Sequence, residues 1–277
     1  VFENYEKPEN YKQLTKIQEL LYKIKYQDLN INNERCKNLF YRTRDREKIK
    51  NLLDGPKYID YNLFGTVTGR LTTNPESFPI LTMRQDYRKI IKPHNDFFLS
   101  LDYNGAEIRT FIGLFGNEQP KSDIHQWNVD NIFNGEINRD VAKTVFFAWL
   151  YNPDSKTIKT DLYDRKKLLD KWYENGTITT PYWRSIKVIK EKAFNYLLQS
   201  TTADLVLERA AEIDKFLEGK KSFISHIIHD EIVIDLVEEE KELTPEIKNI
   251  FSVTPFGKYM VNLYAGKNYF DLKELDL

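Results

Sequence analysis

Residues 97–109 read FFLSLDYNGAEIR, in which an apolar run of strand length ends at Asp102 and a stretch able to form a helix follows. Two further apolar runs, residues 223–228 and 232–237, flank His229-Asp230-Glu231. Runs of this length on either side of a short polar tripeptide predict a hairpin with the tripeptide at its tip. Asp102 and Asp230 therefore each follow a strand, and the junction between strand and helix is expected to place Asp102 at an edge.

Helical patterns surround these strands. Between Tyr11 and Tyr26 the apolar residues recur at spacings of three and four, which is typical of an amphipathic helix. Asn152-Pro153 ends one helical segment, because the residue before proline disfavours the α conformation. Asn175-Gly176 is a hairpin turn signal, and glycines and prolines between residues 57 and 79 predict a long non-helical connection. The other helical segments are residues 106–114, 121–151, 161–173 and 187–216.

Composition limits the class of protein. The chain has 277 residues, 41% of them hydrophobic and 30% charged, which is ordinary for a folded protein with room for a cleft. No apolar run approaches the roughly 20 residues that cross a bilayer, so we expect no membrane span. Cys36 is the only cysteine and cannot form an intramolecular disulfide, which fits a reducing cytoplasm. The abundance of Lys, Asn, Ile and Tyr suggests A+T-rich coding, so a host cytoplasm for a viral protein and an organelle both stay open.

The beginning of the chain shows no secretory leader. Val1-Phe2-Glu3-Asn4 has neither a basic region nor an apolar core, although a chain that opens without Met can be a fragment.

Charge is distributed unevenly along the chain. The formal net charge of −1 argues mildly against nucleic-acid binding, which depends on clustered Lys and Arg. Residues 154–192, however, contain ten Lys or Arg against six Asp or Glu, a net charge of +4. A basic face for nucleic acid and a solvated helix surface both explain this segment.

Two acids at strand ends have a defined chemical use. Phosphoryl transfer between nucleotides uses two metal ions about 4 Å apart, one at the attacking 3′-hydroxyl and one at the triphosphate. Carboxylates of Asp102 and Asp230 could bridge two Mg²⁺ ions, for which Mn²⁺ can substitute. Either acid taken alone is better explained as a turn former, so neither decides the function by itself.

A third pattern is a stripe of four residues at intervals of four, Arg139, Lys143, Phe147 and Tyr151. On a helix they follow one face for about 18 Å. The two cations suit a triphosphate and the two aromatic rings suit a base and sugar. The alternative is an amphipathic helix that buries the rings and leaves the cations in solvent.

Taken in order, these motifs resemble those of family A, DNA polymerase I-like polymerases over roughly residues 58–271. Asp102 to Arg109 resembles motif A (DYSQIELR), the stripe resembles motif B (RxxxKxxxFxxxYG), and His229-Asp230-Glu231 resembles motif C. Four shorter segments add to the match: Thr68-Gly69-Arg70-Leu71-Thr72 resembles TGRLSS, Asp123-Ile124-His125 the DIH motif, Asn195 to Asp204 the NxxxQGxAAD helix, and Gly266-Lys267-Asn268 the GKNW motif.

The resemblance implies an α+β fold, a right-hand polymerase with an antiparallel-sheet palm, helical fingers and a partial helical thumb. It places the partial thumb at residues 1–57, the palm at 58–116 and 191–277, and the fingers at 117–190. The implied activity is template-directed DNA synthesis, in which dNTPs are added to a primer 3′-hydroxyl on primer–template DNA.

The resemblance also implies a role for each matched residue. Asp102 and Asp230 hold the metal ions, with Glu231 as a less secure third ligand. Lys143 is catalytic and grips the triphosphate together with Arg139. Phe147 and Tyr151 frame the base and sugar, while Glu107 fills the volume that a ribose 2′-hydroxyl needs. Residues expected to contact the duplex near the primer end, through minor-groove acceptors common to all base pairs, are Arg70, Asn195, Gln199 and His229.

Several positions depart from the family pattern. Asn104-Gly105 stands where Ser-Gln is common, Asn152 replaces a glycine, and Trp183 precedes Arg184 where Gly-Arg is usual. The stretch between motif B and Gln199 is short, too few residues precede Lys57 for a full thumb, and we find no acidic motifs of a proofreading 3′–5′ exonuclease. We therefore expect a fragment or a split, minimal polymerase that obtains thumb, exonuclease or processivity function from a separate chain.

Two other functions compete with DNA synthesis. A single-subunit RNA polymerase shares the carboxylates, but such enzymes usually lack the equivalent of Glu107 and carry Ser after the motif C Asp. A catalytically weak DNA-binding or accessory subunit would explain the short fingers and the net charge near zero. The joint presence of Asp102, Asp230, Arg139 and Lys143 argues against that alternative.

Overall fold

A five-stranded antiparallel sheet forms the centre of the computed structural model, which describes residues 6–32, 43–158 and 160–276. The strand order is β14 (Lys273–Glu274), β13 (Val261–Gly266), β5 (Phe97–Tyr103), β10 (Glu231–Leu236) and β9 (Phe223–Ile228). The predicted strand and hairpin are confirmed. Because β5 is the middle strand, Asp102 does not lie on a sheet edge as expected; it lies near the end of the central strand.

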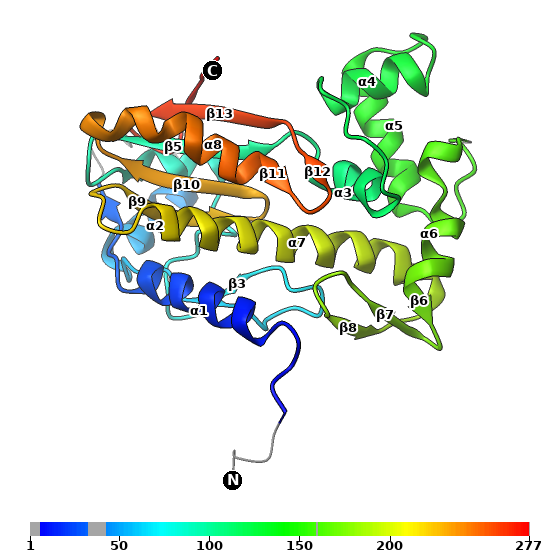
Figure 1. Cartoon of the computed structure of the whole chain (residues 1–277). Coiled ribbons are helices and arrows are strands. Elements are labelled where there is room, and N and C mark those ends of the chain that lie inside the picture. Colours follow the sequence, from blue (N-terminus) through cyan, green and yellow to red (C-terminus); the bar gives the residue numbers. More distant parts are fainter. Residues whose placement is uncertain (1–5, 33–42, 159, 277) are drawn as a thin grey trace.

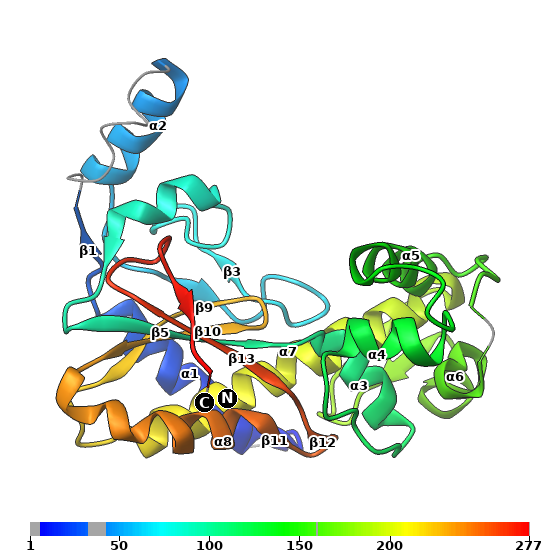
Figure 2. The same cartoon turned by 90° about the horizontal axis from the view of Figure 1, so that it is seen from above.

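Three helices cover one face of this sheet (Figures 1 and 2). They are α1 (Tyr11–Lys25), α7 (Lys190–Phe216) and α8 (Thr244–Ser252). The predicted stripe of α1 is buried, and its 27-residue neighbour α7 is about 40 Å long at 1.5 Å per residue. The predicted start of α7 at residue 187 is wrong, because Ser185–Lys187 pairs with another strand as β8. A hairpin of β11 (Val253–Thr254) and β12 (Gly257–Lys258) follows α8.

The opposite face is covered by a region of short elements. The expected non-helical connection contains only β2 (Tyr61–Asn62) and β3 (Thr72–Thr73) before η2 (Gln85–Ile90), and β4 (Ile91–Lys92) pairs with β1 (Asn30–Ile31). Two α-helices of the described chain were not expected from the sequence, α8 and α2 (Thr43–Asp54). Asp45 of α2 is buried and accepts hydrogen bonds from Tyr87 Oη (2.6 Å) and Arg84 Nη1 (2.9 Å).

A second, mainly helical unit lies at the other end of α7 (Figure 2). Its aromatic core joins Phe111, Phe146, Trp149, Tyr163 and Phe194 from four elements. Besides the beginning of α7, the whole unit consists of α3 (Ala106–Leu114), α4 (Ile124–Asn131), α5 (Arg139–Tyr151), η3 (Asp161–Tyr163), α6 (Arg165–Trp172) and the small sheet of β6 (Tyr173–Glu174), β7 (Thr177–Thr179) and β8.

Several local predictions in this second unit are confirmed. Helix α5 ends at Tyr151, directly before Asn152-Pro153. The Asn175-Gly176 turn has positive φ at both residues, 49° and 77°, as a tight hairpin turn requires. The predicted helix at 161–173 is shorter and is preceded by the turn η3.

The fold is therefore α+β with an antiparallel sheet, as expected. The proposed limits of thumb, palm and fingers stay predictions. Cys36 and Val1 to Asn4 lie outside the described residues. None of the helices in the described ranges is both long and apolar enough to cross a membrane.

Candidate active site

Asp102 and Asp230 line the same cavity, which has a volume of about 340 Å³. Asp230 belongs to the two-residue turn between β9 and β10, where His229 adopts a left-handed conformation with φ of 56°. In the neighbouring strands, Glu231 and Asn262 lie directly opposite Asp102. The sheet register therefore brings the two acids together although 128 positions separate them.

Both carboxyl groups are largely shielded from solvent. Burial raises the pKa of Asp102 to about 7, and the nearby charges of Asp230 and Glu231 add to the shift. Burial likewise raises the pKa of Asp230. Opposing these effects, Lys143 and the hydrogen bond from Asn262 stabilise the charged form of Asp102. Two buried carboxylates that repel one another form a site that a bound cation would stabilise.

Glu231 occupies a different position from the one predicted. It is the first residue of β10 and does not lie at the hairpin tip. Its two carboxylate oxygens accept hydrogen bonds from Ser100 Oγ and Tyr269 Oη, each at 2.6 Å. It is not among the described lining residues of the cavity, and the described part of the chain contains no group of three or more acids, histidines or cysteines arranged for a metal. A role for Glu231 as metal ligand stays a prediction.

The stripe of α5 faces the cavity. Arg139, Lys143, Phe147 and Tyr151 all line it, so the predicted helix face is confirmed. The rings of Phe147 and Tyr151 stack with centroids 5.9 Å apart and an interplanar angle of 12°. Neither aromatic residue is fully buried, and Tyr151 is 38% exposed. The helix thus presents cations at its beginning and flat apolar surface at its end.

Arg139 is held by a carboxylate from the neighbouring helix. Its Nε and Nη2 donate to the two oxygens of Asp123 at 3.0 and 2.7 Å. Burial raises the pKa of Asp123, but hydrogen bonds from Arg139, the Gln126 amide and Asn104 outweigh it and hold this pKa well below its usual range. The same carboxylate caps α4. Arg139 is half exposed, so an anionic ligand can reach it from the cavity.

Glu107 lies between two partners. It is 8% exposed, it accepts a hydrogen bond from Arg70 Nη2 at 2.5 Å, and it accepts another from the hydroxyl of Tyr151. Glu107 is thus buried, and it pairs with the nearby cation Arg70. Burial raises the pKa of Glu107, while Tyr151 and Arg70 favour its charged form. This network closes the side of the cavity between α3 and α5.

The structure divides the residues predicted to contact DNA. Arg70, Gln199 and His229 line the cavity, whereas Asn195 lies beside it and donates to the backbone oxygen of Tyr151 at 3.3 Å. The lining residues that were not selected as site residues from the sequence include His125 and Asn262. His125 belongs to a recognised motif, and burial lowers its pKa to about 4. Asn262 has no local sequence signal, because only strand pairing places it opposite Asp102.

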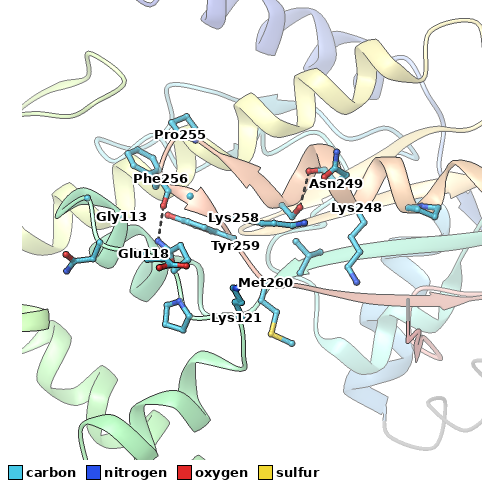
Figure 3. Close-up of a pocket in the computed structure, with 18 residues that line it drawn as sticks. Gly113, Glu118, Lys121, Lys248, Asn249, Pro255, Phe256, Lys258, Tyr259 and Met260 are labelled. Atoms are coloured by element: carbon cyan, nitrogen blue, oxygen red, sulfur yellow. Dashed lines mark hydrogen bonds between the residues drawn. The ribbon is translucent and has the colours of Figure 1, made fainter.

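A larger hollow of about 1050 Å³ lies next to the site, between α8, the β11–β12 hairpin and the segment after α3 (Figure 3). Lys121, Lys248 and Met260 line it, but its described lining includes neither Asp102 nor Asp230. The hollow adjoins the active site through the backbone, since the Asn104 amide donates to the Met260 oxygen at 3.0 Å. The larger of these two cavities is therefore not the one that contains the two acids.

Comparison with known proteins gives a consistent result. No protein-family model matches the chain. A DNA polymerase I from Chloroflexus aurantiacus is 23% identical over 282 residues, covering 80% of this chain and 30% of that protein. DNA polymerase I from Aquifex aeolicus is 23% identical over 265 residues, covering 78% and 45%, and the thermostable enzyme of Thermus filiformis is 24% identical over 249 residues, covering 70% and 30%. The chain thus spans less than half the length of these relatives.

A solved structure shares the fold. The POL domain of Pol1 from M. smegmatis, in complex with DNA primer-template and dNTP, superposes with a TM-score of 0.65. It has 16% sequence identity, and the match covers 83% of this chain and 52% of that one. In the order of its motifs, in its fold and in its sequence, the chain is thus similar to the DNA polymerase I-like, family A polymerases.

Proposed function

We propose that this chain catalyses template-directed DNA synthesis, adding dNTPs to the 3′-hydroxyl of a primer. The observation that carries the proposal is the cavity between β5, β10 and α5. One small space combines a carboxylate pair, two cations and a pair of stacked aromatic rings. A deoxynucleoside triphosphate has the complementary parts: an anionic tail that needs cations and a flat base that packs on aromatic surface.

In this proposal Asp102 and Asp230 would hold two Mg²⁺ ions, for which Mn²⁺ can substitute. The site fits such ions, because the two acids are buried and repel one another, which raises the pKa of Asp102 to about 7. When bound, the ions would activate the primer hydroxyl and neutralise charge on the phosphates. Asn262 orients Asp102 by its hydrogen bond, and Glu231 is itself fixed by Ser100 and Tyr269.

The remaining side chains bind and orient the nucleotide. Lys143 faces the acids and adds positive charge beside the phosphates. Arg139 exchanges its bonds with Asp123 for phosphate oxygens, which accept a planar guanidinium equally well. Phe147 and Tyr151 provide the surface for the base and sugar, and Glu107 excludes a ribose 2′-hydroxyl.

Primer–template DNA is the proposed macromolecular substrate. Arg70, Gln199 and His229 border the acids and are suited to contact the base pair at the primer end. Asn195 reaches this region only by way of the Tyr151 backbone, so its contribution is expected to be smaller. Proofreading is not part of the proposed activity, and a separate chain would supply processivity.

Primer extension tests the proposal. The purified chain is mixed with a labelled primer on a longer template, four dNTPs and Mg²⁺. We expect template-dependent extension in the unmodified protein and a loss of about 1000-fold or more in Asp102→Ala and Asp230→Ala. Loss of metal-ion stabilisation costs several kcal/mol, and each factor of ten in rate corresponds to about 1.36 kcal/mol.

Glu239→Ala is the matched control, since Glu239 is an exposed acid beyond the end of β10 whose side chain is 76% accessible. It should extend primers at the normal rate. Normal extension by both aspartate variants would refute the two-acid mechanism. A chain that binds primer–template tightly but extends nothing would favour the accessory-subunit alternative, and extension with rNTPs alone would favour an RNA polymerase.

A further inference from the structure

An exposed tryptophan with an unfavourable backbone conformation lies outside the candidate active site. Trp183 is 62% exposed and has a φ of +62° in the turn between β7 and β8. A bulky side chain rarely occupies the left-handed region, and such residues persist only where their surroundings enforce them. The sequence pattern of the family commonly has glycine at this position. An aromatic ring is therefore kept in solvent at an energetic cost.

The turn that carries this ring is rigid. Thr180 is 2% exposed; its backbone oxygen accepts from the Trp183 amide at 2.9 Å, and its hydroxyl accepts from the amides of Tyr182 and Arg184 at 3.3 Å. Arg184 in turn pairs with the buried carboxylate of Asp204, with contacts of 2.6 and 3.0 Å. The ring of Trp183 is thus presented from a fixed base, which suits a binding surface.

A groove of about 700 Å³ extends from Trp183 to the end of α6. At its far end lies a second tryptophan, Trp172, whose buried indole N–H has no hydrogen-bond partner among the described residues. The ammonium group of Lys171 lies 5.1 Å from the centre of that ring. The ammonium group of Lys171 is the cation that this end of the groove offers to an anionic ligand.

The floor of the groove is the outer face of the small sheet. Ile178 and Ile186 pair across β7 and β8 and are buried, so the alternate positions point outward. Thr177 lies opposite Lys187 there, and Thr179 lies opposite Ser185. The groove itself is lined between the two tryptophans by Thr177 and Thr179, and Lys171 lies at its Trp172 end. Glu174 is the one acid among the described residues that line the groove.

Arg184, the neighbour of Trp183, approaches a loop that borders the active site. Gly69 lies so close to Arg184 that an added Cβ would be 2.4 Å from its Nη2. Gly69 and Arg70 also line the cavity that holds Asp102 and Asp230. A strand leaving the cavity past Gly69 would therefore meet Trp183 first and Trp172 farther along the hairpin.

We propose that this groove binds the unpaired template strand of DNA outside the active site. Exposed aromatic rings with lysines and hydroxyl groups between them are the usual surface for single-stranded nucleic acid, in which bases stack on the rings and phosphates approach the cations. The groove lies within residues 154–192, the segment with a net charge of +4. The inference rests on the proposed DNA synthesis for the identity of the strand.

Binding to two primer–templates tests this inference. They share one duplex, and the template extends beyond the primer by one nucleotide in the first and by ten in the second. Fluorescence anisotropy at fixed salt gives a Kd for each. We expect the unmodified protein to bind the longer overhang more tightly, and Trp183→Gly to weaken that complex by roughly 5- to 150-fold, the range for losing one base–aromatic stack. The Kd of Trp183→Gly for the primer–template with the one-nucleotide overhang should equal that of the unmodified protein.

The variants separate stacking from folding. Glycine accepts the left-handed conformation, so Trp183→Gly should melt at or above the temperature of the unmodified protein. Trp183→Phe keeps a ring and should retain most of the binding to the longer overhang. Lys171→Ala should lower the salt dependence of that binding by about one released ion. Tyr26→Ala, which removes an aromatic residue that is 83% exposed elsewhere, is the control and should have no effect.

The outcomes for the groove and for the polymerase can be told apart. If Trp183→Gly binds the longer overhang as tightly as the unmodified protein, the groove does not hold the template, whatever the extension assay shows. If the protein extends no primer but binds a free oligo-dT in a manner that requires Trp183, the proposed synthesis fails and single-strand binding stands.

Discussion

Glu107→Ala tests the most specific chemical assignment of the site. The Glu107 side chain is 92% buried, and its carboxylate is fixed by Arg70 and the Tyr151 hydroxyl beside the stacked ring that would support the sugar. Placing an additional hydroxyl in that filled volume costs about 1–3 kcal/mol. At about 1.4 kcal/mol per factor of ten, this predicts a roughly 5- to 150-fold preference for deoxyribose that alanine should remove.

The substitution should also slow synthesis. Without the carboxylate, Arg70 and Tyr151 lose a charged partner, and a hydrogen bond to a charged group is worth about 1.5–3 kcal/mol. Tyr151 is expected to become less well positioned, so kcat/KM for dNTPs should fall while kcat/KM for rNTPs falls less or rises. Glu107→Gln is the matched control, because it preserves the volume and can still accept from Arg70.

The assay is kcat/KM for dCTP and CTP opposite a template G in the three proteins. The ratio should decrease by at least about fivefold in Glu107→Ala and stay within a few-fold of the original in Glu107→Gln. An unchanged ratio in the alanine variant would show that Glu107 does not select the sugar. An equal loss in both variants would show that charge, and not volume, makes the distinction.

Three further outcomes follow from the structure. Burial lowers the pKa of His226 to about 3, so below about pH 6.5 only the unfolded state takes up a proton at this residue. The free energy of unfolding should therefore fall by about 1.4 kcal/mol per pH unit between pH 6.5 and pH 4. Urea unfolding at several pH values should show that His226→Phe has a smaller dependence of this free energy on pH, by one proton. Arg109→Met leaves the backbone oxygens of Asn104, Pro120 and Ser122 without this donor and should cost about 3 kcal/mol or more, lowering Tm by about 6–12 °C in a calorimetric scan. Primer–template affinity should decline steeply between 50 and 200 mM salt, and a mismatched primer end should not be shortened without dNTPs; rapid shortening would reveal an exonuclease.

The parts of the fold that could be predicted have a local signal. Strand β5 and the hairpin of β9 and β10 are mainly apolar, because both faces of the sheet are covered. Helix α5 carries its functional residues at intervals of four, so the pattern that defines the helix also defines the site. Asn175-Gly176 specifies its turn by backbone preference alone.

Helix α2 shows why other parts could not be predicted. Seven of its twelve residues are charged, and Ile49 is its one fully buried apolar residue, so the apolar periodicity is weak. What stabilises its position is the bond network of Asp45 with Arg84 and Tyr87, about 40 residues away. A partner so distant in sequence leaves no trace in a local pattern.

The same limit applies to the departure at Asn104, which the structure explains. Asn104 Oδ1 accepts from the Ile124 amide at 2.7 Å and from Arg109, and its Nδ2 donates to Asp123 at 2.6 Å. Asp123 in turn holds Arg139. A serine hydroxyl is shorter and has a single oxygen, so it could not make all of these bonds. Asn104 therefore couples the strand end that carries Asp102 to the helix that carries Arg139 and Lys143. A site that had lost its activity would have no physical need for that coupling, so the departure supports a working polymerase and not an inert subunit.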